Sequence, residues 1–383
     1  MRRAALALGL AACATPPAPT HVVSVVEPAA SVRPAPAPVE VAPPPSGPTI
    51  RIGMNDASLC VLHAGRVHCR TRADRHTEGA ALLEAPPIEG ISGATDLAMA
   101  GTHACALLGD GAVACFGDNG QGQLGAGIPD ASSVIARRVA GVARARAVAA
   151  GPAHTCAIVE GGAVWCWGDN ALGQTGHGTW YARDARELVT AHPVPGVTGA
   201  RALGLAHGVS CAATAGGVWC WGLTHARGQQ ASHPPALDAS FPEVAAFGGG
   251  AQGLCFVDPG GHLACKASSW GGTDVARGAG SVQSPRKVGV GSSHACALGA
   301  DRKVVCWGAN YSGQLGFPPD RDGASVDEER ATPVVVAGLP PVVDLVVGAY
   351  GACVLTVGDD LWCWGSHPGG SADHSAPAPV RLR

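Results

Sequence analysis

The chain has 383 residues, with 55 Gly, 30 Pro, 15 Cys and a formal net charge of −3, and only 14% of its residues are charged. Many Gly and Pro with few charges disfavour long amphipathic helices and favour short strands joined by tight turns. Lysine occurs only at positions 266, 287 and 303 and there is no basic run, so the chain lacks the positive surface that nucleic-acid binding requires.

The first thirteen residues form a pattern of basic, apolar and small residues that ends in a cysteine. Arg2 and Arg3 precede a short apolar stretch, and Leu10-Ala11-Ala12-Cys13 resembles a lipobox. The apolar stretch is too short to span a bilayer. We therefore expect cleavage before Cys13, lipid attachment to its sulfur, and an exported protein anchored in the cell envelope, in the outer membrane or at the cell surface. A plain signal peptide with an incidental cysteine is the alternative.

Residues 14–49 contain eleven prolines. Proline has no N–H and a locked φ, so this segment is expected to be an extended tether without a packed core. The predicted organisation is a signal peptide over residues 1–12, a lipidated cysteine and tether over 13–49, and a folded domain over 50–383.

The remaining fourteen cysteines fall into pairs separated by nine or ten positions, and the pairs recur about every 49 residues. The pairs are Cys60 with Cys69, Cys105 with Cys115, Cys156 with Cys166, Cys211 with Cys220, Cys255 with Cys265, Cys296 with Cys306, and Cys353 with Cys363. Seven repeats of this length fill residues 50–383.

Each pair brackets a predicted β-hairpin. Folding the 105–115 segment about Asp110 places Cys105 opposite Cys115, and Gly beside the tip supplies the positive φ of a tight hairpin. Opposed residues of antiparallel strands are close enough for a disulfide. Disulfides also suit an exported chain. Buried reduced thiols and a metal site are the alternatives, although the pairs lack zinc-knuckle spacing.

The flanking residues repeat as well. Segments 115–125, 166–176 and 306–316 follow the pattern Gly-x-Asn-x-x-Gly-Gln-Leu-Gly, with Thr175 in place of Leu in the second. This pattern resembles the repeat of the regulator of chromosome condensation family. The resemblance implies an all-β fold, a seven-bladed β-propeller with four-stranded blades.

Ring closure is expected from the C-terminal strand. Residues 284–288 and 332–336 are expected to open repeats with a Pro-led strand, and no such strand precedes the first repeat. The similar segment 378–382 is therefore expected to complete the first blade.

Two residue types recur beside the cysteines and are expected to have structural roles in the blades. His103, His154 and His294 precede a first cysteine by two positions, where they would satisfy backbone groups at a turn. Tryptophans flank the second cysteine at positions 165, 167, 219, 221, 307, 362 and 364, where strand alternation points them at the neighbouring blade.

The predicted function is a non-catalytic binding scaffold that contacts a protein partner through its inter-blade loops. The best-known family members act on chromatin and promote nucleotide exchange on a small nuclear GTPase. An exported protein would not meet those partners, so that activity is not expected here. The candidate contact residues are Trp180, Tyr181, Arg183 and Trp270, because they lie outside the repeat.

Two alternatives remain open. Trp180, Tyr181 and Trp270 could bind carbohydrate or peptidoglycan. An enzyme with its site in the axial channel is less favoured, because the innermost strands contain mainly Ala, Gly and Val. The chain is expected to be monomeric, with no cofactor, metal site or catalytic residue.

Overall fold

The computed structural model describes residues 50–55, 58–71, 81–128, 132–177, 187–226, 229–238, 244, 246–250, 253–258, 263–267, 284–318, 330–368 and 378–380. All of these belong to one unit, Ser46–Arg383. The signal peptide, Cys13 and the tether lie outside the described residues, as do Trp180, Tyr181, Arg183 and Trp270. No helix within the described ranges is long and apolar enough to span a membrane.

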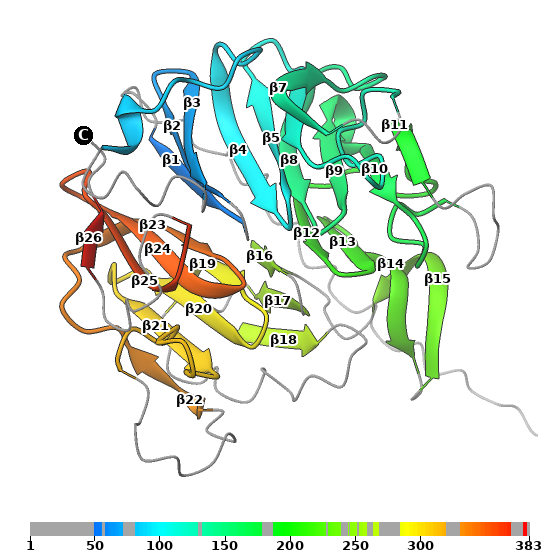
Figure 1. Cartoon of the computed structure of the whole chain (residues 1–383). Coiled ribbons are helices and arrows are strands. Elements are labelled where there is room, and N and C mark those ends of the chain that lie inside the picture. The colour runs from blue at the N-terminus through cyan, green and yellow to red at the C-terminus, as the bar shows by residue number, and fades with distance from the viewer. Residues whose placement is uncertain are drawn as a thin grey trace, which may run out of the picture. The chain divides into compact units, whose positions relative to one another are not determined.

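The described strands form antiparallel sheets whose strands follow chain order, and each sheet is named here by its first strand (Figure 1). The β4 sheet has four strands: β4 (Ala94–Ala100), β5 (His103–Leu108), β6 (Val113–Gly117) and β7 (Ser133–Arg138). The β8 sheet has β8 (Ala145–Ala150), β9 (His154–Val159), β10 (Val164–Asp169) and β11 (Glu187–Pro193). The β12 sheet has β12 (Ala202–Ala206), β13 (Val209–Thr214), β14 (Gly217–Ala226) and β15 (Gln229–Asp238). Two more are formed by β19 (Pro285–Val290), β20 (His294–Gly299), β21 (Val304–Gly308) and β22 (Arg330–Val335), and by β23 (Val342–Val347), β24 (Tyr350–Thr356), β25 (Leu361–Ser366) and β26 (Ala378–Val380). Three-stranded sheets are formed by β1 (Arg51–Met54), β2 (Ser58–His63) and β3 (Arg66–Thr71), and by β16 (Ala246–Gly249), β17 (Gly253–Val257) and β18 (Leu263–Ala267).

The fold is therefore an all-β propeller with four-stranded blades. The expectation of seven four-stranded blades is not met in full, because the β1 and β16 sheets have three strands in the described residues. In the β1 sheet a single antiparallel bridge, His68 to Pro87, stands at the outer edge of β3. A proline there is tolerated because an edge position needs no N–H donor.

The core lies between successive sheets. Trp167 of the β8 sheet, for example, is fully buried against Leu124, in the turn after β6, and Val139, directly after β7. Packing of the same kind joins each sheet to the next, and it also joins Ile52 and Met54 of the first sheet to residues of the last sheet. Because both faces of a blade are covered, middle strands such as β5 are buried along their whole length.

The repeated triplet of cysteine, aromatic residue and glycine has a structural cause. In β10 the register against β11 shifts between Cys166, opposite His192, and Gly168, opposite Leu188, so the extra residues of this irregularity lie on β11, opposite Trp167. Gly168 has a φ of 98°, and a Cβ there would lie 2.7 Å from the Ala153 carbonyl oxygen. Only glycine fits this position, so the triplet marks the third strand of a blade.

The predicted hairpin register is confirmed, because the two cysteines of every pair lie directly opposite each other on the second and third strands of their sheet. The structure joins each pair as a disulfide, with Cα atoms 3.9–4.1 Å apart. In chain order the disulfides are Cys60 to Cys69, Cys105 to Cys115, Cys156 to Cys166, Cys211 to Cys220, Cys255 to Cys265, Cys296 to Cys306, and Cys353 to Cys363.

The cysteine pairs differ in burial. Most of these cysteines are fully buried, such as Cys306, which is 0% exposed. Cys220 and Cys265 are each 9% exposed, and Cys69 is only partly buried. Cys69 and Cys265 lie on β3 and β18, the last strands of the two three-stranded sheets. No fourth strand pairs with β3 or β18 in the described residues, so these two cysteines are less covered than Cys306.

The predicted ring closure is wrong. β26 pairs with β25, Val380 opposite Leu361, and so completes the last sheet instead of the first. Likewise, the Pro-led segment 332–336 contributes to β22, which ends its sheet, whereas Pro285 does begin one. Pairing with the nearby β25 closes a short loop, which costs less chain entropy than crossing to another sheet. The first and last sheets are joined by side-chain packing.

Candidate functional site

A buried hydrogen-bond relay connects the repeated residues of neighbouring sheets. His103 Nε2 lies 2.7 Å from Thr155 Oγ1, and that hydroxyl donates to the Gln123 carbonyl oxygen at 3.4 Å. The indole Nε1 of Trp167 donates to the same carbonyl oxygen at 2.9 Å. Because the hydroxyl hydrogen is used on Gln123, the His103 Nε2–H must be the donor to Thr155.

The relay recurs between the β8 and β12 sheets. His154 Nε2 lies 2.8 Å from Ser210 Oγ, and both Ser210 Oγ and Trp221 Nε1 donate to the Gln174 carbonyl oxygen at 2.8 Å. Between the β19 and β23 sheets Trp364 Nε1 again donates to a glutamine carbonyl, that of Gln314. The equivalent of Thr155 and Ser210 is Ala352 there, which has no hydroxyl for His294.

The three histidines are neutral parts of the frame. Burial lowers the pKa of His103 to about 4, that of His154 to about 3 and that of His294 to about 4. The structural role expected from the sequence is therefore supported, but the observed partners of His103 and His154 are hydroxyl groups of the next sheet, not turn backbone. Of the repeated tryptophans, those at 167, 221, 307 and 364 are almost fully buried, and those at 165, 219 and 362 are partly buried.

The Asn and Gln of the repeat shape the turn after the third strand. Asn119 Oδ1 accepts the Leu124 N–H at 2.9 Å, and Gln123 Nε2 donates to Asp118 Oδ2 at 2.9 Å. The same pair of contacts holds the 169–175 turn. These side chains are satisfied within the frame, as expected for turn residues.

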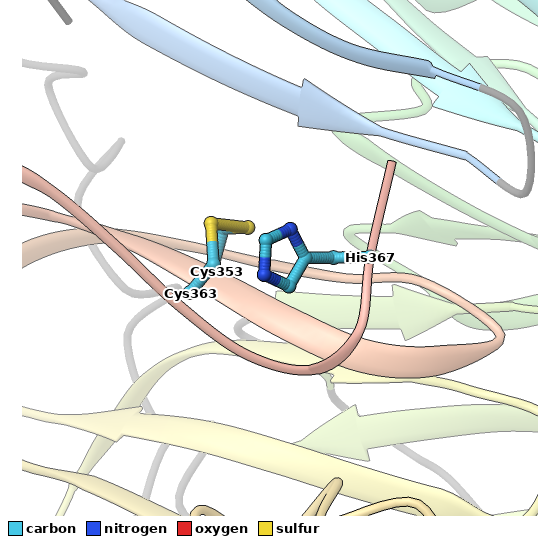
Figure 2. Close-up of side chains that lie close together, drawn as sticks. All are labelled: Cys353, Cys363 and His367. Atoms are coloured by element: carbon cyan, nitrogen blue, oxygen red, sulfur yellow. A yellow bond between two sulfur atoms is a disulfide. The ribbon is translucent and has the colours of Figure 1, made fainter. Parts of the chain in front are cut away.

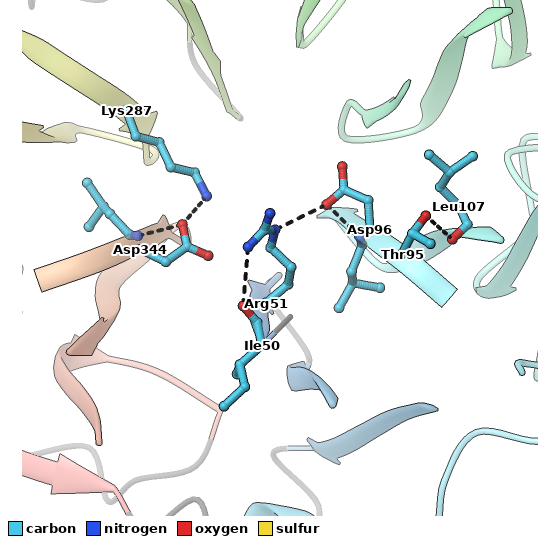
Figure 3. Close-up of polar contacts among 9 residues, drawn as sticks. Ile50, Arg51, Thr95, Asp96, Leu107, Lys287 and Asp344 are labelled. Carbon is cyan, nitrogen blue, oxygen red and sulfur yellow. Dashed lines mark hydrogen bonds and ion pairs between the residues drawn. The ribbon is translucent and has the colours of Figure 1, made fainter. Parts of the chain in front are cut away.

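A charged arc lies on the innermost strands, where the sequence led us to expect mainly Ala, Gly and Val. Its four residues are Arg51, Asp96, Lys287 and Asp344 (Figure 3). Each stands two positions before the residue that faces the first cysteine of its sheet. The equivalent positions in the β8 and β12 sheets are Ala147 and Ala202. Aligning the repeats on that cysteine would have revealed the arc.

The arc contains two oppositely charged pairs. Lys287 Nζ lies 2.5 Å from Asp344 Oδ1, and Arg51 Nε lies 4.0 Å from Asp96 Oδ1. Each carboxylate also accepts the N–H of the residue that follows it, at 2.9 Å. Partial burial raises the pKa of Asp96, and this effect outweighs the lowering by the Leu97 N–H and by Arg51. The contacts hold these carboxylates in place, which favours a binding or structural role over proton transfer.

One further cluster resembles a metal site in its residue types. Cys353, Cys363 and His367 place their ligand atoms within 4.8 Å of one another (Figure 2). The two cysteines form a disulfide, and thiolates are the form of cysteine that binds metal. The cluster therefore offers no thiolate ligand while the disulfide is intact.

Two exposed tyrosines lie at the opposite end of the inner strands from the charged arc. Tyr311 follows β21 and Tyr350 begins β24, and their ring centroids are 6.4 Å apart. They are 58% and 42% exposed, and the Tyr311 hydroxyl lies 2.6 Å from Ser293 Oγ. The sequence pattern does not predict this pair, because Tyr311 lies inside the repeat and Tyr350 in another blade.

The predicted contact residues Trp180, Tyr181, Arg183 and Trp270 lie outside the described residues, so the structure does not place them. The Tyr311–Tyr350 pair and the charged arc are the candidate surfaces within the described part of the chain.

Comparison with known proteins supports the repeat. Models described as the Regulator of chromosome condensation (RCC1) repeat match residues 95–123, 145–174 and 286–314, and a second model of the same description matches residues 303–355. These segments contain the triplets of cysteine, aromatic residue and glycine described above.

Solved structures with the same fold include a chain of the complex of Kap60 with yeast RCC1 (Prp20). It matches with a TM-score of 0.60 and 16% identity over 75% of each chain. The ectodomain of the Physcomitrella patens receptor kinase CR4 matches with a TM-score of 0.52 and 20% identity, over 84% of this chain and 75% of that one. The ectodomain of the Arabidopsis thaliana receptor kinase ACR4 matches with a TM-score of 0.50 and 16% identity, over 88% of this chain and 98% of that one. Together, the strand order and the matched segments show that this chain is a β-propeller with repeats similar to the Regulator of chromosome condensation (RCC1) repeat.

Proposed function

We propose that this protein is a non-catalytic scaffold that binds a protein partner with one end of its propeller. The observation that carries the proposal is the pair of exposed tyrosines, Tyr311 and Tyr350, whose rings lie close together at one end of the propeller. Exposed tyrosines supply large contact area at low entropic cost and are enriched at binding hot spots. The unplaced residues Trp180, Tyr181, Arg183 and Trp270 remain part of this proposal as loop contacts.

The similar structures support this kind of activity. The structure of Kap60 bound to yeast RCC1 contains a protein partner, and the two plant proteins are receptor-kinase ectodomains. Propellers of this fold thus occur in protein complexes and in ectodomains. We further propose that the two three-stranded sheets are also blades, which makes the ring seven-bladed.

We test the binding surface with a double variant. Combining Tyr311→Ala with Tyr350→Ala is expected to weaken binding of the envelope partner by about 30-fold, as for loss of a hot spot, with an unchanged melting temperature. The partner is first isolated by using the wild-type propeller as bait in a cell-envelope extract, and its affinity is then measured by calorimetry.

The matched control changes two exposed apolar residues of an outer strand. Val134 and Ile135 are 84% and 45% exposed on β7, and combining Val134→Ala with Ile135→Ala is expected to leave the affinity unchanged. Equal affinities for wild type and the tyrosine variant would contradict this surface. If the captured partner is a glycan instead of a protein, the scaffold is a carbohydrate-binding propeller.

We also propose that the protein is an exported lipoprotein of the cell envelope. The lipobox-like segment ending at Cys13 supports this proposal, as do the disulfides, which persist in oxidising compartments. Mass spectrometry of the membrane-extracted protein is expected to find a diacylglyceryl group on Cys13, and Cys13→Ser is expected to release the protein to the soluble fraction. Identical fractionation of variant and wild type would contradict the anchor.

A further inference from the structure

The joint between the first and last sheets differs from the other joints of the propeller. Elsewhere the chain runs directly from one sheet into the next, but β1 begins the first sheet and β26 ends the last one. In the described residues β26 pairs with β25, so the first and last sheets are linked neither by a shared strand nor by a chain connection. Side-chain contacts such as those of Ile52 and Met54 with Leu355 and Leu361 hold it together.

The four charges of the arc flank this joint and alternate in sign. Lys287 and Asp344 form a pair on one side, while Arg51 and Asp96 form a pair on the other. Across the joint, the second carboxylate oxygen of Asp344 faces Arg51, which lies between the two aspartates (Figure 3). Asp344 is only 8% exposed, and this oxygen, Oδ2, is buried without a hydrogen-bond partner.

Arg51 is held weakly in its present position. Its Nε lies 4.0 Å from Asp96 Oδ1, and its Nη1 donates to the Ile50 carbonyl oxygen at 3.4 Å. The side chain is 41% exposed, and a guanidinium group carries five N–H donors. A shift toward Asp344 would exchange a long, exposed contact for a charge-assisted bond to a buried oxygen, and such bonds are the stronger kind.

We propose that Arg51 is a movable clasp of the propeller, whose guanidinium exchanges between Asp96 in the second sheet and Asp344 in the last sheet. In the Asp344 position it bridges the joint between the first and last sheets, across which the chain does not run. The clasp therefore controls how often the first and last sheets separate, independently of partner binding at the tyrosines.

Hydrogen exchange of the full chain, followed by mass spectrometry, tests the clasp. Arg51→Met removes the guanidinium group but keeps the apolar stem, so amides of β1 and β23 are expected to exchange about fivefold faster. Asp96→Asn leaves Arg51 with one charged partner, Asp344, so exchange at β1 and β23 is expected to be slower than in wild type. A fixed Arg51–Asp96 pair predicts instead that both variants exchange faster, which would overturn the proposal.

The matched control is a salt bridge that lies away from the joint between the first and last sheets. Arg146 Nη2 lies 3.2 Å from Glu160 Oε1 in the β8 sheet, and Arg146→Met is expected to leave exchange at β1 and β23 unchanged.

Salt provides a second measurement, which does not require Arg51→Met to fold. Raising NaCl to about 1 M shortens the screening length to about 3 Å, so it is expected to speed exchange at the joint in wild type and in Asp96→Asn. No salt effect at β1 and β23 in either protein would contradict the clasp.

Discussion

Replacing Trp167 by alanine is expected to lower the free energy of unfolding by about 3–5 kcal/mol, the range for large-to-small changes of buried aromatic residues. Trp167 is fully buried between two sheets, where it packs on Leu124 and donates its indole N–H to the Gln123 carbonyl oxygen. The variant therefore loses both a large apolar contact and the only hydrogen bond that the indole makes in the described structure. Chemical denaturation of the variant and wild type measures the change.

Two further variants separate these contributions. Trp167→Phe keeps most of the apolar contact and removes the N–H, so its cost is expected to be about 1–2 kcal/mol. Trp165→Ala changes a partly buried residue of the same strand, so its cost is expected to be well below that of Trp167→Ala. Equal losses for Trp165→Ala and Trp167→Ala would mean that Trp167 is not a principal inter-blade contact.

Lowering the pH from 7 to 4 is expected to destabilise the propeller steeply, because three buried histidines stay neutral in the folded state. The pKa is about 4 for His103, about 3 for His154 and about 4 for His294, each below the ordinary value of 6.5. Between pH 6.5 and about 4 the unfolded chain therefore binds protons at these positions that the folded chain does not. Each histidine contributes a loss of up to about 1.4 kcal/mol per pH unit in this window and none above it.

Thermal unfolding as a function of pH measures this dependence. His154→Gln cannot be protonated and is expected to remove about one third of the histidine contribution, so its stability should fall less between pH 6.5 and 4. Comparing the variant with wild type at each pH cancels the contribution of the carboxylates to the pH dependence, because they titrate in both proteins. A variant whose stability falls as steeply as that of wild type would show that His154 is protonated in the folded state.

The sequence by itself determined the repeating unit of this protein. The spacing of Cys105 and Cys115 predicts their opposition across a hairpin, because strand register and loop length are local properties. The burial of Trp167 follows from the same local pattern. The turn role of Asp118 and Asn119 could also be predicted, since their bonds reach only a few residues along the chain.

The tertiary structure alone decided how the ends of the ring meet and which residues gather there. β26 could pair at the edge of either the first or the last sheet by pattern alone, and only the packed fold shows it on β25. Arg51 and Asp344 are almost 300 positions apart, and ring closure brings them to one joint. Tyr311 and Tyr350 likewise become neighbours because their sheets pack together. Such contacts depend on the arrangement of sheets around the axis, which no local periodicity encodes.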